Sequence, residues 1–122
     1  MNSLKELVNK WIKDGSIEEF GVSALQIRSM FGANDKGIVL TGRGIENHER
    51  STFIIEEGIS TDAALGQLVT LQSVNDSVIW ITESFTDEHM KAVKWLESSC
   101  HVRIRTGCYD IIFEEPPKLI KH

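Results

Sequence analysis

The chain has 122 residues, of which 41% are hydrophobic and 25% are charged, and its formal net charge is −5. These values are typical of one globular domain, which we place at residues 1–115, followed by a loose C-terminal tail at 116–122. An acidic chain lacks the broad basic face that is needed to grip DNA or an anionic membrane. No apolar run is long enough to span a bilayer and no signal peptide is present, so we expect a cytoplasmic protein without membrane contact.

The N-terminal segment predicts a helix. Ser3 and Glu6 form a capping-box pattern, and Gly15 is typical of a helix end. The apolar face of this helix comes from residues at helical spacing: Leu4, Leu7, Val8, Trp11 and Ile12. A second, short helix is expected after Ser23, with its own set of apolar residues: Ala24, Leu25, Ile27 and Met30.

Two strands and a helix follow. The runs Gly37–Thr41 and Ser51–Glu57 are rich in β-branched and aromatic residues, and a polar loop joins them. A helix is expected over residues 62–72, with either Ser60 or Thr61 as its N-cap. The order strand, helix, strand that continues from here predicts a parallel pair of strands with a right-handed crossover.

The run Val78–Ile81 shows no alternation between apolar and polar residues. A strand that is apolar on both faces is covered on both faces, so we place this strand in the middle of the sheet. Another helix is expected after it, because Thr86 suits an N-cap and acidic Asp87 and Glu88 suit a helix N-terminus. The sequence therefore predicts an α/β fold with a mixed central sheet flanked by helices.

The last predicted element is a hairpin over residues 101–113, with its turn at Thr106 and Gly107. Alternation on its first strand puts His101, Arg103 and Arg105 on one face. This basic row has two interpretations that the sequence leaves open: phosphate binding, or protection of a sheet edge. The tail after the hairpin is expected to be loose, because prolines cannot join a β-ladder.

The segments "FIIEEGISTDAALGQLVTL" (53–71) and "SVIWITESFTDEHMKAVKWLE" (77–97) resemble a known family. It is a family of small bacterial domains, mostly of unknown function, within the restriction-endonuclease-like PD-(D/E)XK superfamily, and it carries a "VIWI…EHxxAxxWL" segment. The resemblance covers about residues 37–113. It implies a restriction-endonuclease-like core, in which two antiparallel strands precede a helix and a buried strand.

The resemblance also implies a chemistry. Family members use an Asp and a Glu on neighbouring strands to hold a divalent metal, and a Lys or Gln two residues after the Glu to orient water. In this chain Glu56 matches the Glu, but the Lys or Gln position falls on Gly58 and the Asp position falls near Gly37. The catalytic pattern is therefore degenerate, unless Asp35 takes the place of the missing Asp.

Three functions remain open at this stage. The first is a catalytically silent nuclease-fold protein that binds a nucleic acid, a nucleotide or a protein, as an inhibitor or accessory factor of a nucleic-acid-processing or phage-defence system. The second is an active, Mg²⁺-dependent endonuclease with migrated catalytic residues: Asp35, Glu56 and Gln67. The third is a homo-oligomeric assembly protein, such as a dimer paired through a sheet edge. Under the first function no cofactor is expected, Glu56 is the single metal-ligand candidate, and Arg103, Arg105 and His101 are the candidate phosphate contacts.

Overall fold

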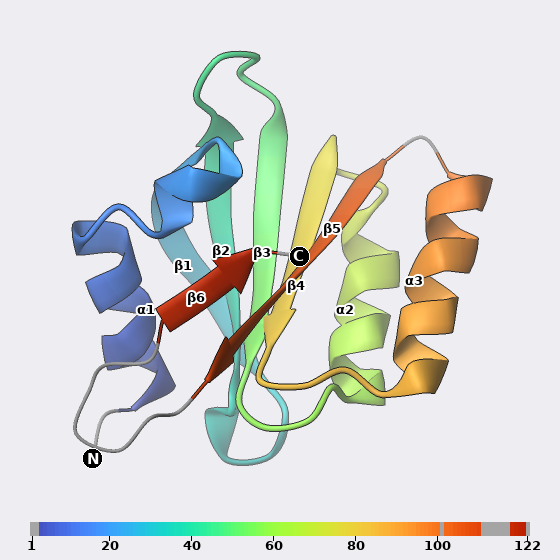
Figure 1. Cartoon of the computed structure of the whole chain (residues 1–122). Helices are drawn as coiled ribbons and strands as arrows, with labels where there is room; N and C mark the ends of the chain where they lie inside the picture. The colour runs from blue at the N-terminus through green and yellow to red at the C-terminus, as the bar shows by residue number, and fades with distance from the viewer. Residues whose placement is uncertain (1–2, 101, 111–117, 122) are drawn as a thin grey trace.

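The computed structural model describes residues 3–100, 102–110 and 118–121, which form one mixed sheet with helices on both faces (Figure 1). The six strands lie in sequence order across the sheet. The first three pair antiparallel, β3–β4–β5 pair parallel, and β6 returns antiparallel to β5. The bounds are α1 Leu4–Lys13, η1 Ile17–Phe20, β1 Val22–Phe31, η2 Ala33–Asp35, β2 Gly37–Gly44, β3 Arg50–Glu56, α2 Asp62–Leu71, β4 Ser77–Thr82, α3 Asp87–Ser99, β5 Arg103–Asp110 and β6 Lys118–Lys121.

Each face of the sheet has its own core. On the first face, which we call the α1 face, α1 and η1 pack against inward-pointing residues of β2, β3 and β4. On the second, the α2–α3 face, two helices cover the other side of the same strands. Figure 1 shows α1 and the pair α2–α3 separated by the sheet. The α/β class and the mixed sheet with flanking helices are thereby confirmed.

The strand β4 lies at the centre of this arrangement, as its lack of alternation predicts. All six of its residues, Ser77–Thr82, are buried. Ile79 and Ile81 belong to the core of the α1 face, whereas Val78 and Trp80 belong to the core of the α2–α3 face. Its neighbours β3 and β5 both run parallel to it, so no edge of β4 is exposed.

The helix starts follow from local sequence. Ser3, Thr61 and Thr86 are the N-caps of the three α-helices, and each side-chain oxygen accepts a hydrogen bond from the backbone N–H three residues later. These bonds satisfy donors that the first turn of a helix cannot pair internally. Of the two N-cap candidates for α2, the structure selects Thr61 over Ser60.

The prediction of a short helix after Ser23 is wrong, because residues 22–31 form the edge strand β1. Its pairing with β2 shifts register between Ala24 and Gln26 and again between Ile27 and Ser29. Such bulges break the two-residue alternation of a strand. Ala24 and Ile27 consequently reach the same core although they are three residues apart, a spacing that imitates a helix.

The predicted hairpin is also wrong. Thr106 and Gly107 lie inside the continuous strand β5, where they pair with Trp80 and Ile81 of β4. A Thr-Gly pair indicates a turn only where no neighbouring strand forms hydrogen bonds with its backbone. Here β4 forms these hydrogen bonds. The antiparallel partner of β5 is β6, Lys118–Lys121, which lies within the segment expected to be a loose tail. The prolines of that tail lie outside the described residues.

No helix in the part of the chain that the structure describes is long and apolar enough to cross a membrane.

The core of the α1 face offers a stability test at Trp11. Its side chain is 1% exposed, and its ring meets that of Tyr109 edge-to-face at 5.1 Å between centroids. We expect Trp11→Ala to lower the free energy of unfolding by about 3–5 kcal/mol, because it removes a large buried side chain and leaves a cavity. Trp95→Ala is the matched control: this ring is 66% exposed, and a change of about 0.5 kcal/mol or less is expected. Urea denaturation measures the free energy of unfolding of both variants. Equal losses would contradict the assignment of Trp11 to the core of the α1 face.

Candidate functional site

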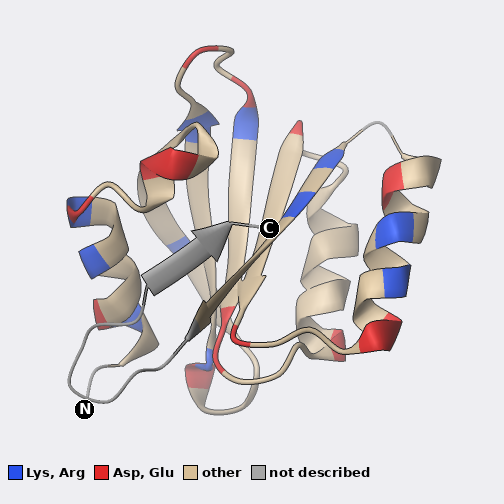
Figure 2. Cartoon of the chain, in the orientation of Figure 1, with Lys and Arg blue, Asp and Glu red and all other residues tan. Residues whose placement is uncertain are grey.

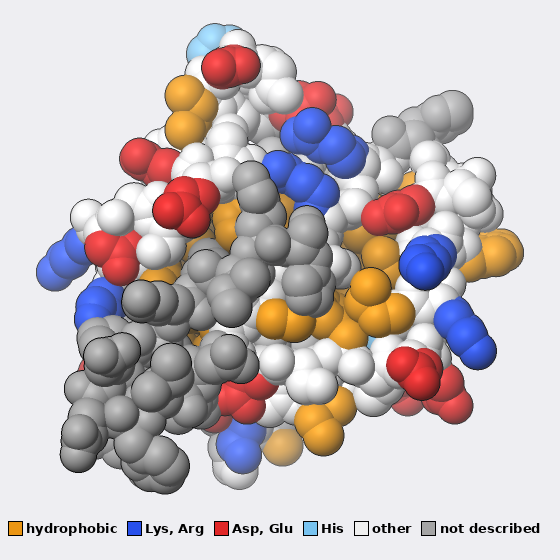
Figure 3. Space-filling view, viewed as in Figure 1, with side chains coloured by type: hydrophobic (Ala, Val, Ile, Leu, Met, Phe, Trp, Pro, Cys, Tyr) orange, Lys and Arg blue, Asp and Glu red, His pale blue; other side chains and the backbone are white. Residues whose placement is uncertain are grey.

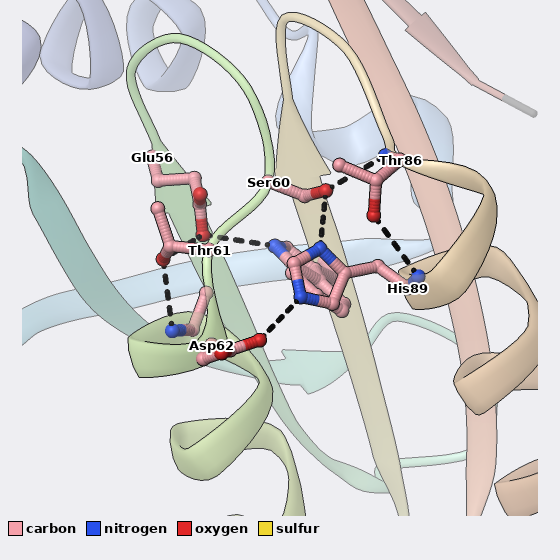
Figure 4. Close-up of polar contacts among 8 residues, drawn as sticks. Glu56, Ser60, Thr61, Asp62, Thr86 and His89 are labelled. Carbon is pink, nitrogen blue, oxygen red and sulfur yellow. Dashed lines mark hydrogen bonds and ion pairs between the residues drawn. The ribbon is translucent and has the colours of Figure 1, made fainter.

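Glu56 ends β3 and turns its carboxyl group into the core of the α2–α3 face. The residue is 2% exposed. Its Oε2 accepts a hydrogen bond from the indole Nε1–H of Trp80 at 3.1 Å and a longer one from the Thr61 hydroxyl at 3.4 Å. Its other oxygen, Oε1, is buried and has no hydrogen-bond partner. Figure 4 shows Glu56 and Thr61 close together at the start of α2.

This enclosure changes the acidity of Glu56. Burial raises the pKa of its carboxyl group to about 7, although the hydrogen bonds from Trp80 and Thr61 act in the opposite direction. Near neutral pH the group is therefore a mixture of the neutral and ionised forms. One oxygen of this single carboxyl group is engaged by the indole N–H of Trp80, whereas Mg²⁺ sites in proteins use ionised carboxylates together with bound water.

The two other positions of the family's catalytic pattern are held by glycine for structural reasons. Gly37 pairs directly with Glu56 across the β2–β3 ladder, but a Cβ atom at Gly37 would lie only 2.4–2.6 Å from ring atoms of Phe31. The Phe31 ring thus fills the space that an Asp side chain would need. Gly58 has a φ of +78°, in the left-handed region where a Lys or Gln would be strained.

The structure does not bring Asp35 and Gln67 to Glu56. Asp35 lies in η2 and lines a depression of about 310 Å³ with Glu57 and residues at the start of α1, on the α1 face. Gln67 is half-buried on α2, and the hydrogen bonds that Glu56 Oε2 accepts come from Trp80 and Thr61 instead. Within residues 3–100, 102–110 and 118–121, no group of three His, Cys, Asp or Glu side chains could hold a metal ion.

A second polar group lies beside Glu56. His89 Nδ1 is 2.6 Å from the Ser60 hydroxyl, and His89 Nε2 is 2.8 Å from Asp62 Oδ1 (Figure 4). An ionised carboxylate only accepts, so Nε2–H donates to Asp62. Ser60 Oγ also accepts the backbone N–H of Thr86 at 2.9 Å.

Serine, histidine and aspartate in a row suggest a hydrolase triad, but the geometry favours a structural role. In hydrolase triads the serine bonds to Nε2 and the aspartate to Nδ1, which is the reverse of the order here. Ser60 is 6% exposed and already accepts a backbone hydrogen bond. The network instead joins the start of α2, through Asp62, to the start of α3, through Thr86 and His89.

The arginine row lies on the opposite face. Ile104 belongs to the core of the α2–α3 face, so its neighbours Arg103 and Arg105 project to the α1 face. Arg103 pairs with Glu49 at 3.1 Å, whereas Arg105 Nη1 donates to the Phe20 carbonyl at 2.6 Å and its guanidinium lies 5.9 Å from the centre of the Phe20 ring. The third member, His101, lies outside the described residues.

Both arginines border an open cavity of about 380 Å³. Its other walls come from η1 and from the loop after β2: Glu18, Phe20, Gly21, Ile45, Glu46 and Asn47. Arg105 Nε and Nη2 are buried and have no hydrogen-bond partner. Burial lowers the pKa of Arg105, and the positive charge of Arg103 adds to this effect, but an arginine remains charged at neutral pH.

The two candidate regions lie at opposite ends of the sheet as well as on opposite faces. Because β3, β4 and β5 run parallel, Arg103 at the start of β5 lies at the same end as Arg50 at the start of β3, and Glu56 lies at the other end. Figure 2 shows the basic segments of β3 and β5 together at one end and the acidic end of β3 at the other. A phosphate held by the arginines would therefore not face Glu56.

Comparison with family models, curated proteins and solved structures finds no match for this chain.

Sequence reasoning identified some of these residues and missed others. Glu56 and the two arginines follow from motif and alternation. Ser60 was expected only as an N-cap, and Phe20 and Asn47 were not expected near Arg105 at all. Their contacts join residues far apart in the chain, and no local pattern signals them.

Glu56 generates a prediction about pH. Because its pKa rises on folding from the ordinary value of 4.5 to about 7, the native state loses stability as pH increases through this window. Glu56→Gln keeps an acceptor for Trp80 but cannot ionise. We expect the stability of the variant relative to the wild type to grow by up to about 3 kcal/mol between pH 4.5 and 8. Urea titrations at several pH values measure this, and parallel stability curves for the two proteins would contradict it.

The Ser60–His89 contact generates a second prediction. Ser60→Ala leaves His89 Nδ1 and the Thr86 N–H without their buried partner, so we expect a loss of about 1–3 kcal/mol in the free energy of unfolding. Ser98→Ala is the matched control, since the Ser98 hydroxyl donates only to the Trp95 carbonyl on an exposed helix end. A loss no larger than that of Ser98→Ala would show that the network does not stabilise the fold.

Proposed function

We propose that this protein is a catalytically silent, nuclease-fold binding protein. The order β2–β3–α2–β4, with antiparallel β2 and β3 and a buried parallel β4, supports a restriction-endonuclease-like core, because the family resemblance implies two antiparallel strands followed by a helix and a buried strand. Fold alone does not decide activity, so the argument depends on the residues at the position of the metal site.

The observation that carries the proposal is the contact between Phe31 and Gly37. A metal-dependent nuclease of this kind needs two carboxylates on neighbouring strands, and the register puts Gly37 beside Glu56. The Phe31 ring occupies the place of the second carboxylate. A single enclosed carboxyl group cannot hold the metal that would activate water and neutralise the charge on the phosphate.

The alternative functions have less support. An active nuclease with migrated residues would need Asp35 near Glu56, but Asp35 borders a depression on the other face of the sheet. An assembly protein paired through β1 would need a regular edge, and the two register shifts in β1 interrupt the ladder that a second copy would extend. Binding through the cavity beside Arg103 and Arg105 therefore remains the best-supported activity, with a phosphate-bearing molecule as the partner.

For the biological context, we propose from the resemblance that the protein acts as an inhibitor or accessory factor in nucleic-acid processing or phage defence.

The proposal predicts no cleavage of plasmid DNA by the purified protein in Mg²⁺ or Mn²⁺. It also predicts no Mn²⁺ binding at Glu56, because only one partly protonated carboxyl is available. Agarose gels measure the first outcome, and calorimetric titration with Mn²⁺, comparing the wild type with Glu56→Ala, measures the second. Cleavage that disappears in Glu56→Ala would overturn the proposal, whereas cleavage that persists in this variant would indicate a contaminating nuclease.

A further inference from the structure

Arg105 has hydrogen-bonding capacity that the fold does not use. One of its terminal nitrogens is fixed by the Phe20 carbonyl at 2.6 Å, and the Phe20 ring lies 5.9 Å from the guanidinium carbon. The remaining donors, Nε and Nη2, have no partner although both atoms are buried. Leaving buried donors unpaired costs free energy, so an acceptor that reaches them gains more than it would on an exposed arginine.

The chemistry of these donors suits an oxyanion. Nε–H and one Nη–H of a guanidinium form the parallel pair that binds carboxylate or phosphate oxygens in a bidentate manner. Arg103 lies two residues away on the same face of β5, about 6.6 Å along the strand, and can supply a second positive charge. Its ion pair with Glu49 is half-exposed, and such pairs contribute little to stability, so a stronger anion can displace it.

The remaining walls of the cavity limit what the anion can be attached to. Glu18 and Glu46 line the same cavity, and Glu49 pairs with Arg103. Three carboxylates around two arginines would repel the successive phosphates of a nucleic-acid strand, whereas one phosphate group can be neutralised by Arg103 and Arg105 alone. Beside them, Asn47 offers an amide and Ile45 offers an apolar side chain that is 49% exposed.

We infer that this cavity binds a small phosphomonoester of mononucleotide size, with its phosphate on Arg105 and Arg103 and its organic part against Ile45. The inference rests on the proposed binding function and specifies its ligand. The volume of about 380 Å³ lies within the range of about 300–1,000 Å³ that is usual for small-molecule sites. Figure 3 shows basic side chains together near one end of the face that carries α1.

The first test uses the unmodified protein. Adenosine 5′-monophosphate, ribose 5-phosphate and adenosine are titrated separately to about 10 mM while the Arg105 Nε–H signal is followed by NMR. The phosphate esters should shift this signal in a saturable manner, and adenosine should not. The absence of a saturable shift with both esters would overturn the inference, as would an equal response to adenosine.

Variants then locate the site. Arg105→Lys keeps the charge but loses the bidentate fork, so we expect binding of adenosine 5′-monophosphate to weaken at least about tenfold. Arg28→Lys makes the same chemical change on β1, beside a different depression that Thr41 and Arg50 also line, and should leave binding unchanged. Equal weakening by both substitutions would overturn the assignment of the site.

A short single-stranded DNA oligonucleotide separates the inference from the broader proposal. Tighter binding of the oligonucleotide than of adenosine 5′-monophosphate, with loss in Arg105→Lys, would overturn the single-phosphate ligand and leave a silent binding protein in place. Plasmid cleavage that depends on Glu56, together with ester binding at Arg105, would overturn the proposed function and leave the site in place. Weaker binding of the oligonucleotide than of the monophosphate is the result we expect.

Discussion

The complete burial of β4 is the constraint on which the rest of the structure depends. A strand with apolar side chains on both faces is stable only where both faces are covered, and all six residues of β4 are buried. The covering layers are α1 on one side and α2 with α3 on the other. Parallel β3 and β5 satisfy the backbone groups of β4 on its two edges. The crossover helices α2 and α3 follow from these parallel pairs, since each chain reversal must return over a face of the sheet.

This burial also explains why Glu56 differs from a metal-binding carboxylate. Trp80 is fully buried in β4, and a buried indole needs an acceptor for its N–H. Glu56 on the neighbouring strand supplies that acceptor. In addition, the Tyr109 hydroxyl donates to the Glu56 carbonyl at 3.0 Å, which fixes the backbone at the end of β3. Glu56 thus helps to hold the fold through its carbonyl and its Oε2 atom, and the burial that this requires raises the pKa of its carboxyl group.

The sequence alone was sufficient to predict the features that depend on residues close together along the chain. The N-caps Ser3 and Thr86, the buried strand and the faces of Arg103 and Arg105 all follow from spacing and residue type, and the N-cap of α2 was narrowed to Ser60 or Thr61. It was insufficient to predict the features that depend on contacts between residues far apart in the chain. Two bulges gave β1 a helix-like spacing of apolar residues, and pairing with β4 kept Thr106 and Gly107 extended.

The same distinction applies to the candidate sites. A glycine at position 37 indicates a missing carboxylate, but only the packing shows that the Phe31 ring lies where a side chain at this position would begin. Likewise, alternation places Arg105 on a face but cannot show that Phe20, 85 residues away in the chain, holds its guanidinium.

Parallel strand direction separates the two candidate regions in a way that bears on function. Residues that begin β3 and β5 gather at one end of the sheet, and residues that end β3 gather at the other. Arg105 also projects to the α1 face, whereas the Glu56 carboxyl projects to the α2–α3 face. The arginine cavity is therefore remote from the Glu56 carboxyl group. The proposed binding at the arginines does not require the Glu56 end of the sheet to remain open, so Trp80 and Thr61 can enclose Glu56 without affecting the proposed site.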